Sequence, residues 1–258
     1  MKISIYFLAL ILLMISEPGR TQDRQYYELR SYHCSTSKQI DRLDEYLSKT
    51  FIPTMEQNGM HEIGVFKSLS NDTAAHKSLF VLIPAANIGD LEKISDIMVA
   101  NASHSKLGED YLHTSHDNPV YDRIEISWLR AFTDMPMMAK PKFSTAIDKR
   151  VFELRSYEGA SETLYRRKVD MFNAGGEIAL FESLGFNAVF YAEVLAGAHM
   201  PNLVYMTSFE DMASRERHWS DFRASPTWLK LKSLDKYKNT VSKADIYLLR
   251  PTDYSTIK

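Results

Sequence analysis

The sequence predicts an α+β protein made of two tandem ferredoxin-like units, each with the element order β-α-β-β-α-β. The first observation is an internal repeat, in which Tyr-Glu-Leu-Arg-Ser-Tyr at 27–32 returns as Phe-Glu-Leu-Arg-Ser-Tyr at 152–157. The second is the length of 258 residues, which allows two units of ordinary domain size. The third is the composition, with 45% hydrophobic and 25% charged residues, which is typical of a globular protein.

Residues 1–22 predict a secretory signal peptide. A lysine at position 2 precedes an almost unbroken apolar run from Ile3 to Ile15, and Ser-Glu-Pro-Gly-Arg then ends this run. The run is short for a membrane span, although an uncleaved anchor is the competing interpretation. We therefore expect an exported protein, periplasmic or extracellular, with no membrane span after signal cleavage.

Residues 23–132 are expected to form the first unit. Alternating aromatic residues from Tyr26 to His33 predict a strand, and apolar residues at spacings of three and four predict a helix over 35–58 that Pro53 kinks or divides. The remaining expected elements are strands at 60–69 and 79–83, helices at 90–102 and 106–112, and a closing strand at 121–132.

Residues 150–258 repeat this order after a linker at 133–149, whose proline and lysine content predicts a solvent-facing connection. A strand at 151–157 is followed by a helix that Gly175 and Gly176 should weaken. Two middle strands at 188–195 and 203–209 precede helices that begin at Asp211 and at Ser225-Pro226, and a last strand covers 244–250.

Composition and motifs exclude several classes of function. The formal net charge is −2 and no polybasic block occurs, so we expect no nucleic-acid partner. Cys34 is the single cysteine and cannot form an internal disulfide. The chain has no glycine-rich nucleotide loop and no Gly-x-Ser-x-Gly motif, so we predict no cofactor. The histidines between 104 and 116 match no standard ligand spacing, so no metal site is predicted.

Several segments resemble the NIPSNAP family. The resemblance rests on the motif that opens each unit, on Leu-Gly-Phe at 184–186, and on Ser-Arg-Glu-Arg-His-Trp at 214–219 with Phe222, Pro226 and Trp228 after it. It covers nearly all of residues 26–250, more clearly in the second unit. The resemblance implies the dimeric α/β-barrel superfamily, in which two ferredoxin-like sheets face one another and enclose a barrel. Because both halves lie in one chain, it implies that one chain closes the barrel alone. The family itself has no settled biochemical activity.

The opening repeat has two faces, because side chains alternate along a strand. We expect its apolar face, with Leu29 and Leu154, to meet the helices. The opposite face carries the predicted ligand-binding residues, which are Glu28, Arg30 and Tyr32 in the first copy and Glu153, Arg155 and Tyr157 in the second. If the sheets close a barrel, this polar face points into it and lines a site for a small organic acid or an oxygenated ring.

Proton transfer in such a site would fall to Tyr32, Tyr157 or His33. We therefore predict a protein that binds a small organic molecule between its two sheets, with the cofactor-independent oxygenase or isomerase chemistry that relatives in the superfamily suggest. The alternative is a non-catalytic protein-interaction module with a packed barrel interior, in which the Glu-Arg pairs satisfy one another and fix how the halves fit together. The sequence leaves this choice open, together with the substrate and the existence of a homo-oligomer.

Overall fold

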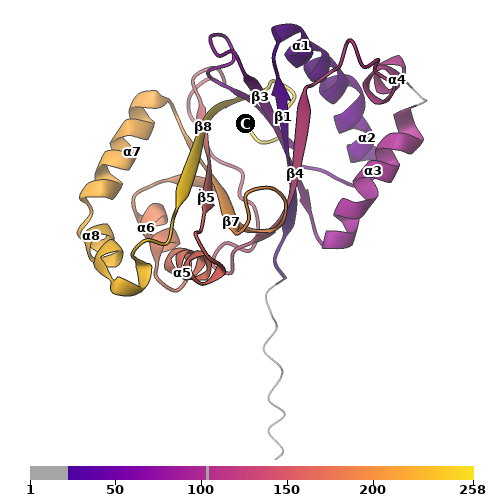
Figure 1. Ribbon diagram of the computed structural model, residues 1–258. Helices are drawn as coiled ribbons and strands as arrows, with labels where there is room; N and C mark the ends of the chain where they lie inside the picture. Colours follow the sequence, from indigo (N-terminus) through magenta and orange to yellow (C-terminus); the bar gives the residue numbers. More distant parts are fainter. Residues whose placement is uncertain (1–22, 103–104) are drawn as a thin grey trace, which may run out of the picture.

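The computed structural model describes residues 23–102 and 105–258, and the predicted signal peptide lies outside this range. Eight strands form a closed antiparallel barrel in the order β1-β3-β2-β8-β5-β7-β6-β4. Helices of the first half cover one side of the barrel, and helices of the second half cover the opposite side (Figure 1). The predicted α+β class with antiparallel strands is confirmed.

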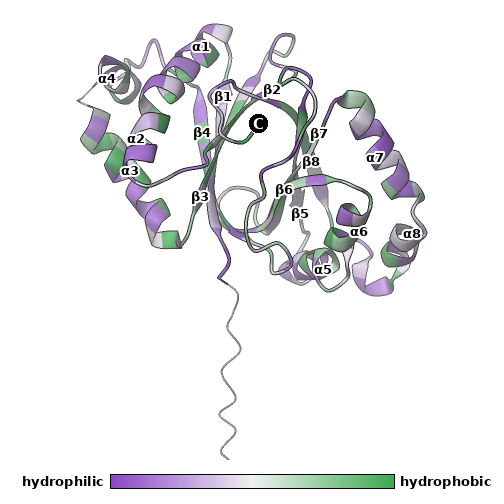
Figure 2. Ribbon diagram, turned by 180° about the vertical axis from the view of Figure 1, so that it is seen from behind, coloured by the Kyte–Doolittle hydropathy of each residue, from purple (hydrophilic) through white to green (hydrophobic). Residues whose placement is uncertain are grey.

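The two halves contain closely matching sets of elements. The first half contains β1 (Tyr26–Cys34), α1 (Ser37–Tyr46), η1 (Leu47–Phe51), α2 (Ile52–Gln57), β2 (Gly64–Ser68), β3 (Lys77–Ala85), α3 (Ile88–Ala102), α4 (Lys106–Leu112) and β4 (Arg123–Ala131). The second half contains β5 (Val151–Glu158), α5 (Glu162–Phe172), α6 (Glu177–Ser183), β6 (Asn187–Ala196), β7 (Asn202–Phe209), α7 (Met212–Ala224), α8 (Pro226–Ser233), η2 (Asp235–Tyr237) and β8 (Lys243–Pro251). Figure 2 shows hydrophilic and hydrophobic stretches alternating along the helices, as expected for amphipathic helices that cover a sheet.

Proline and glycine disturb the regular α-helix in the first helical segment of each half. The predicted helix at 35–58 is continuous but passes through a π-helical turn, η1, directly before Pro53 in α2. Proline has no backbone N–H and its ring crowds the carbonyl four residues earlier, so a wider turn relieves the clash. In the second half the helix stops at Phe172 and restarts after Gly176, whose φ of +85° is left-handed and favours glycine.

The two halves join edge to edge and not as two separate sheets that face one another. Strand β2 pairs with β8 between Phe66–Ser68 and Leu249–Pro251. Strand β4 pairs with β6 through Trp128–Ala131, with a bulge between Trp128 and Leu129. The predicted division into two ferredoxin-like units, each with a sheet of its own, is therefore not confirmed, because the edge strands of each half find their hydrogen-bond partners in the other half of one closed barrel.

Apolar side chains fill the inside of the barrel. One cluster of buried residues, which includes Tyr27, Leu29, Phe66, Phe152 and Phe190, receives members from all eight strands. The rings of Tyr27 and Phe190 lie 5.1 Å apart and those of Phe66 and Phe152 lie 5.0 Å apart, so aromatic residues meet across the interior. The other two large clusters contain the helices of one half each, and they lie outside the barrel.

The two faces of the opening repeat are therefore reversed relative to the sequence prediction. Leu29 and Leu154 point into the barrel, whereas Tyr32 packs with the helical residues Leu43 and Phe51 of the first half. The prediction that the polar face lines the barrel interior is wrong. Apolar groups fill the closed interior because an ion pair there would lose its hydration, while the boundary between sheet and helices supplies polar partners.

The linker at 133–149 contributes to this core. Met138 and Phe143 pack against the interior cluster, and Ile257 of the C-terminal tail belongs to it. Thr145 and Glu210 hold the linker in place through a hydrogen bond of 2.6 Å between their side chains. No residue of 133–149 is fully buried and most are exposed, so the linker faces solvent over most of its length, while Met138 and Phe143 are half-buried against the core. None of the helices within the described residues is long and apolar enough to cross a membrane.

Candidate functional site

The first copy of the polar motif forms a buried ion pair beneath α3. The Nε atom of Arg30 donates to one carboxylate oxygen of Glu28, and the indole N–H of Trp128 donates to the other at 3.0 Å. Both charged residues are less than 5% exposed. Trp128 comes from β4, directly opposite Glu28 in the strand pairing. The Nη1 atom of Arg30 reaches the thioether of Met98 on α3 at 3.2 Å, and a thioether is a weak acceptor.

Tyrosines surround the far side of Arg30. The hydroxyls of Tyr32 and Tyr111 lie 3.0 Å apart, and the rings of Tyr111 and Tyr46 stack with centroids 3.9 Å apart. Burial raises the pKa of Tyr32, and burial also raises the pKa of Tyr111 well above its ordinary value. Both phenols therefore stay protonated at neutral pH, so they can donate hydrogen bonds but cannot act as bases.

A groove of about 500 Å³ opens over this ion pair, and we call it the Arg30 groove. It lies between α3, α4, β4 and the turn after β6. Its lining is mainly apolar and comprises Glu28, Arg30, Leu91, Glu92, Ser95, Met98, Val99, Tyr111, Leu112, Tyr121, Ile124, Ile126, Trp128, Ala196 and Gly197. Ile126 is 42% exposed and Val99 is 62% exposed, so large apolar side chains of the groove face solvent. Volume and lining are those of a small-molecule site.

Gly197 brings the second half close to the groove. A Cβ atom at this position would lie 2.4 Å from the hydroxyl of Ser127 on β4, so only glycine allows the turn after β6 to approach the strand. The Arg30 groove is therefore built from both halves of the chain, with most of its surface from the first.

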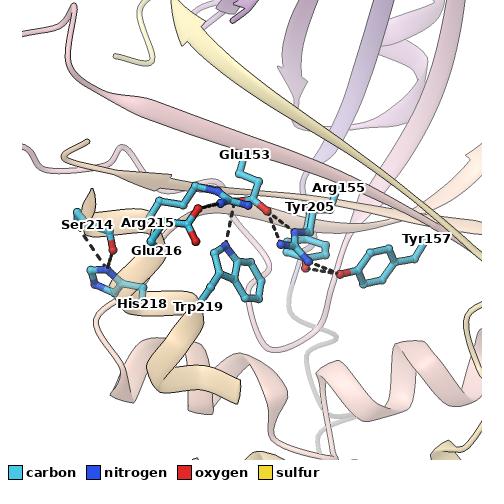
Figure 3. Close-up of polar contacts among 9 residues, drawn as sticks. All are labelled: Glu153, Arg155, Tyr157, Tyr205, Ser214, Arg215, Glu216, His218 and Trp219. Carbon is cyan, nitrogen blue, oxygen red and sulfur yellow. Dashed lines mark hydrogen bonds and ion pairs between the residues drawn. The ribbon is translucent and has the colours of Figure 1, made fainter. Parts of the chain in front are cut away.

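The second copy of the motif is arranged similarly but is filled by protein side chains (Figure 3). One oxygen of Glu153 accepts from Arg155, and the other accepts from Arg215 at 2.6 Å and from the indole N–H of Trp219 at 2.9 Å. The guanidinium carbon of Arg155 lies 3.7 Å from the centre of a Trp219 ring, which is cation–π contact. Arg155 also donates to the hydroxyl of Tyr157 at 2.9 Å.

The difference between the two copies follows from the residues on α3 and α7. The side chains of Asn87 and Asp211 both accept from the backbone N–H three residues later, so they mark equivalent helix starts. Counted from these starts, Leu91 stands where α7 has Arg215, and Ser95 stands where α7 has Trp219. The shorter side chains on α3 do not fill the space over the ion pair, and the groove remains open.

The predicted site residues thus form two separate groups. Glu28, Arg30 and Tyr32 meet under α3, whereas Glu153, Arg155 and Tyr157 meet under α7 on the opposite side of the barrel. The predicted convergence of all six is wrong, because both copies face outward from a closed barrel.

His33 lies apart from both groups. It is on the other face of β1, and its Nε2 atom is 3.7 Å from a carboxylate oxygen of Glu125. It does not line the Arg30 groove.

Sequence reasoning missed the residues that make the groove. Trp128, Met98 and Tyr111 contact the motif from β4, α3 and α4. An alignment of the two halves on their helix caps would have shown that Ser95 occupies the position equivalent to Trp219. Within residues 23–102 and 105–258, no group of three or more histidine, cysteine, aspartate or glutamate side chains is placed to hold a metal ion.

Solved structures with a similar fold cover most of the chain. A candidate monooxygenase from Fusobacterium nucleatum aligns with a TM-score of 0.56 and 8% identity, over 89% of this chain and 93% of that one. An anthrone oxidase-like protein aligns with a TM-score of 0.54 and 12% identity, over 90% and 93%. A candidate monooxygenase from Lactobacillus acidophilus aligns with a TM-score of 0.51 and 11% identity, over 88% and 94%. At these identities the likeness shows the fold.

The family comparison concerns the second half. No curated protein matches the chain. The family model described as NIPSNAP matches residues 152–256, which begin at the second copy of the motif and include α7 with Arg215 and Trp219. The second half therefore matches the NIPSNAP family model, in agreement with the resemblance seen in the sequence.

Proposed function

We propose that this protein binds a small, planar, largely apolar molecule in the Arg30 groove. The observation that carries the proposal is the contrast between the two copies of one motif. Arg215 and Trp219 both donate to the buried Glu153 in the second half, whereas in the first half a groove lined by Glu28 and Arg30 lies under α3. Large apolar side chains exposed around a polar floor are expected of a binding site.

The barrel interior is not the proposed site, because the buried cluster of all eight strands fills it. This packed interior is what the alternative of a non-catalytic interaction module requires. The groove favours the small molecule over a protein partner, since it is recessed between helices and sheet and has a buried ion pair at its floor.

A pair of matched variants tests the proposal. Ile126 pairs with Arg30 and Ile246 pairs with Arg155, so the two isoleucines hold equivalent positions, and they are 42% and 46% exposed. Quinoline is a suitable probe because it is planar, uncharged above neutral pH and able to accept one hydrogen bond. Saturation-transfer NMR should detect quinoline binding to the wild type.

The two variants should respond differently. Ile126→Glu places a charge in the wall of the groove that quinoline would have to desolvate on binding, so it should weaken quinoline binding by about tenfold or more, which corresponds to about 1.4 kcal/mol. Ile246→Glu should leave binding unchanged. No binding to the wild type, or equal loss in both variants, contradicts the proposal.

Oxygenation is a second candidate function, and Glu28 is the observation that favours it, because its carboxylate lies at the floor of the groove. Glu28 would take one proton from an acidic CH₂ group of a bound ring, and the resulting carbanion would be oxidised by O₂. One oxygen atom would enter the product as a carbonyl and the other would leave as water with both hydrogens. The name of one fold relative, the anthrone oxidase-like protein, suggests anthrone as the first substrate to test. If the wild type and Ile126→Glu consume oxygen at the same rate in the presence of anthrone, this reaction is excluded.

We also infer that the barrel arose from two tandem ferredoxin-like units. The strand order within each half is 4-1-3-2, and the repeated motif opens β1 and β5 at the same position. Export of the chain remains a proposal from its first 22 residues.

A further inference from the structure

The two glutamates differ in the number of donors that they hold. In the second half, the Oε2 atom of Glu153 accepts two hydrogen bonds, one from Arg215 and one from Trp219. In the first half, the Oε2 atom of Glu28 accepts one hydrogen bond from the described residues, from Trp128 on β4. A carboxylate oxygen can accept two hydrogen bonds, so Glu28 has room for one more donor on the side of the groove.

Helix α3, which lies above Glu28, has no counterpart of the two donors Arg215 and Trp219 on α7. Leu91 and Ser95 stand at the positions of Arg215 and Trp219, and Leu91 has no polar group in its side chain. Both residues line the groove. The space beside Ser95 therefore corresponds to the space that an indole ring fills on α7.

The surroundings of Trp219 show what that space accepts in the second half. Its ring lies against Phe186 and Phe222, with ring centroids 5.0 and 5.5 Å away, and the guanidinium of Arg155 covers its face. In the Arg30 groove, Met98 and Trp128 provide the apolar contacts and Arg30 provides the guanidinium. An aromatic bicycle with an N–H donor would thus meet the same three kinds of contact.

We propose that the ligand of the Arg30 groove is a bicyclic aromatic molecule of the indole class, whose ring N–H donates to the Oε2 atom of Glu28. Its ring lies beside Ser95, in the place that the side chain of Trp219 takes in the second half. This inference rests on the binding function proposed above and adds the requirement for a hydrogen-bond donor on the ring. The groove is larger than indole itself, so the natural ligand carries substituents toward Val99 and Ile126.

Indole and 1-methylindole form the matched pair of probes, because methylation removes the N–H donor and keeps the ring. Equilibrium dialysis with the full chain should give a dissociation constant for indole about tenfold lower than for 1-methylindole, in keeping with one hydrogen bond to a charged acceptor. Quinoline, which has an acceptor in place of the donor, should bind like 1-methylindole.

Two tryptophan variants locate the ring. Ser95→Trp should fill the space with a side chain, as in α7, and weaken indole binding at least tenfold. Asp96→Trp places the same side chain on an exposed neighbouring position of α3 that does not line the groove, and it should bind indole like the wild type. Circular dichroism verifies that both variants are folded.

The outcomes separate the two proposals. If quinoline binds but indole binds no more tightly than 1-methylindole, the indole assignment is overturned and the binding function stands. Indole binding that Ser95→Trp leaves unchanged also overturns the assignment. If none of the three probes binds, both proposals fail.

Discussion

The substitution Trp219→Ala measures how firmly the second copy of the motif is sealed. The Trp219 side chain is 5% exposed, and its ring packs against Phe181, Phe186 and Phe222. Replacement of a buried tryptophan by alanine typically costs about 3–5 kcal/mol through lost contacts and the cavity that remains. Its hydrogen bond to the charged Glu153 contributes about 1.5–3 kcal/mol, and the two contributions overlap. We expect a loss of about 4 kcal/mol in the free energy of unfolding.

Urea unfolding followed by circular dichroism measures this loss, and Trp219→Phe divides it. Phenylalanine keeps most of the ring packing but has no N–H, so Trp219→Phe should cost about 2 kcal/mol, which corresponds to the hydrogen bond and a small cavity. Arg155 retains an aromatic face in this variant. A cost below about 1 kcal/mol for Trp219→Ala would show that the ring is not tightly packed over Glu153.

Three further predictions concern other buried or hydrogen-bonded groups. Glu153→Gln leaves two guanidinium groups without their shared counter-charge and should destabilise the fold by about 3–5 kcal/mol in urea unfolding, whereas a change below 1 kcal/mol would show that the pair is dispensable. Hydrogen bonds from Thr145 and the Ser144 backbone lower the pKa of Glu210 from 4.5 to about 2, so its stabilisation is complete above about pH 4.5 and is lost as the pH falls through 2. Glu210→Gln should therefore lower the melting temperature more at pH 7 than at pH 2, where about half of the Glu210 carboxyls are already protonated, and an equal decrease at both would contradict the assignment. Burial raises the pKa of Cys34 to about 12, so iodoacetamide at pH 8 should label it only in urea, and rapid labelling of the native chain would contradict its burial.

The sequence predicted the helices and strands more accurately than the strand pairing that closes the barrel. Periodicity located β1, α4 and β8 to within one or two residues, and the Ser225-Pro226 cap located the start of α8, since local spacing and caps determine where such elements begin and end. It could not show that β2 would pair with β8, because this contact joins residues nearly 185 positions apart and depends on unpaired edges in both halves.

The faces of the repeat were the main error in predicting the site. Alternation separated Glu28, Arg30 and Tyr32 from Leu29 correctly, as strand geometry requires. Alternation does not say which face of a strand is inside, since both faces of β1 are buried, one in the barrel and one beneath the helices. The Arg30 groove could not be predicted from the sequence for a different reason. It depends on the small side chain of Ser95, and a serine on an amphipathic helix gives no signal until it is compared with Trp219.

A crystal structure of the chain with quinoline would show where the ligand binds. We expect one quinoline per chain in the Arg30 groove, against Trp128 and Met98, and none under α7, where Trp219 fills the space. Quinoline inside the barrel, or beneath α7 with Trp219 displaced, would contradict this expectation.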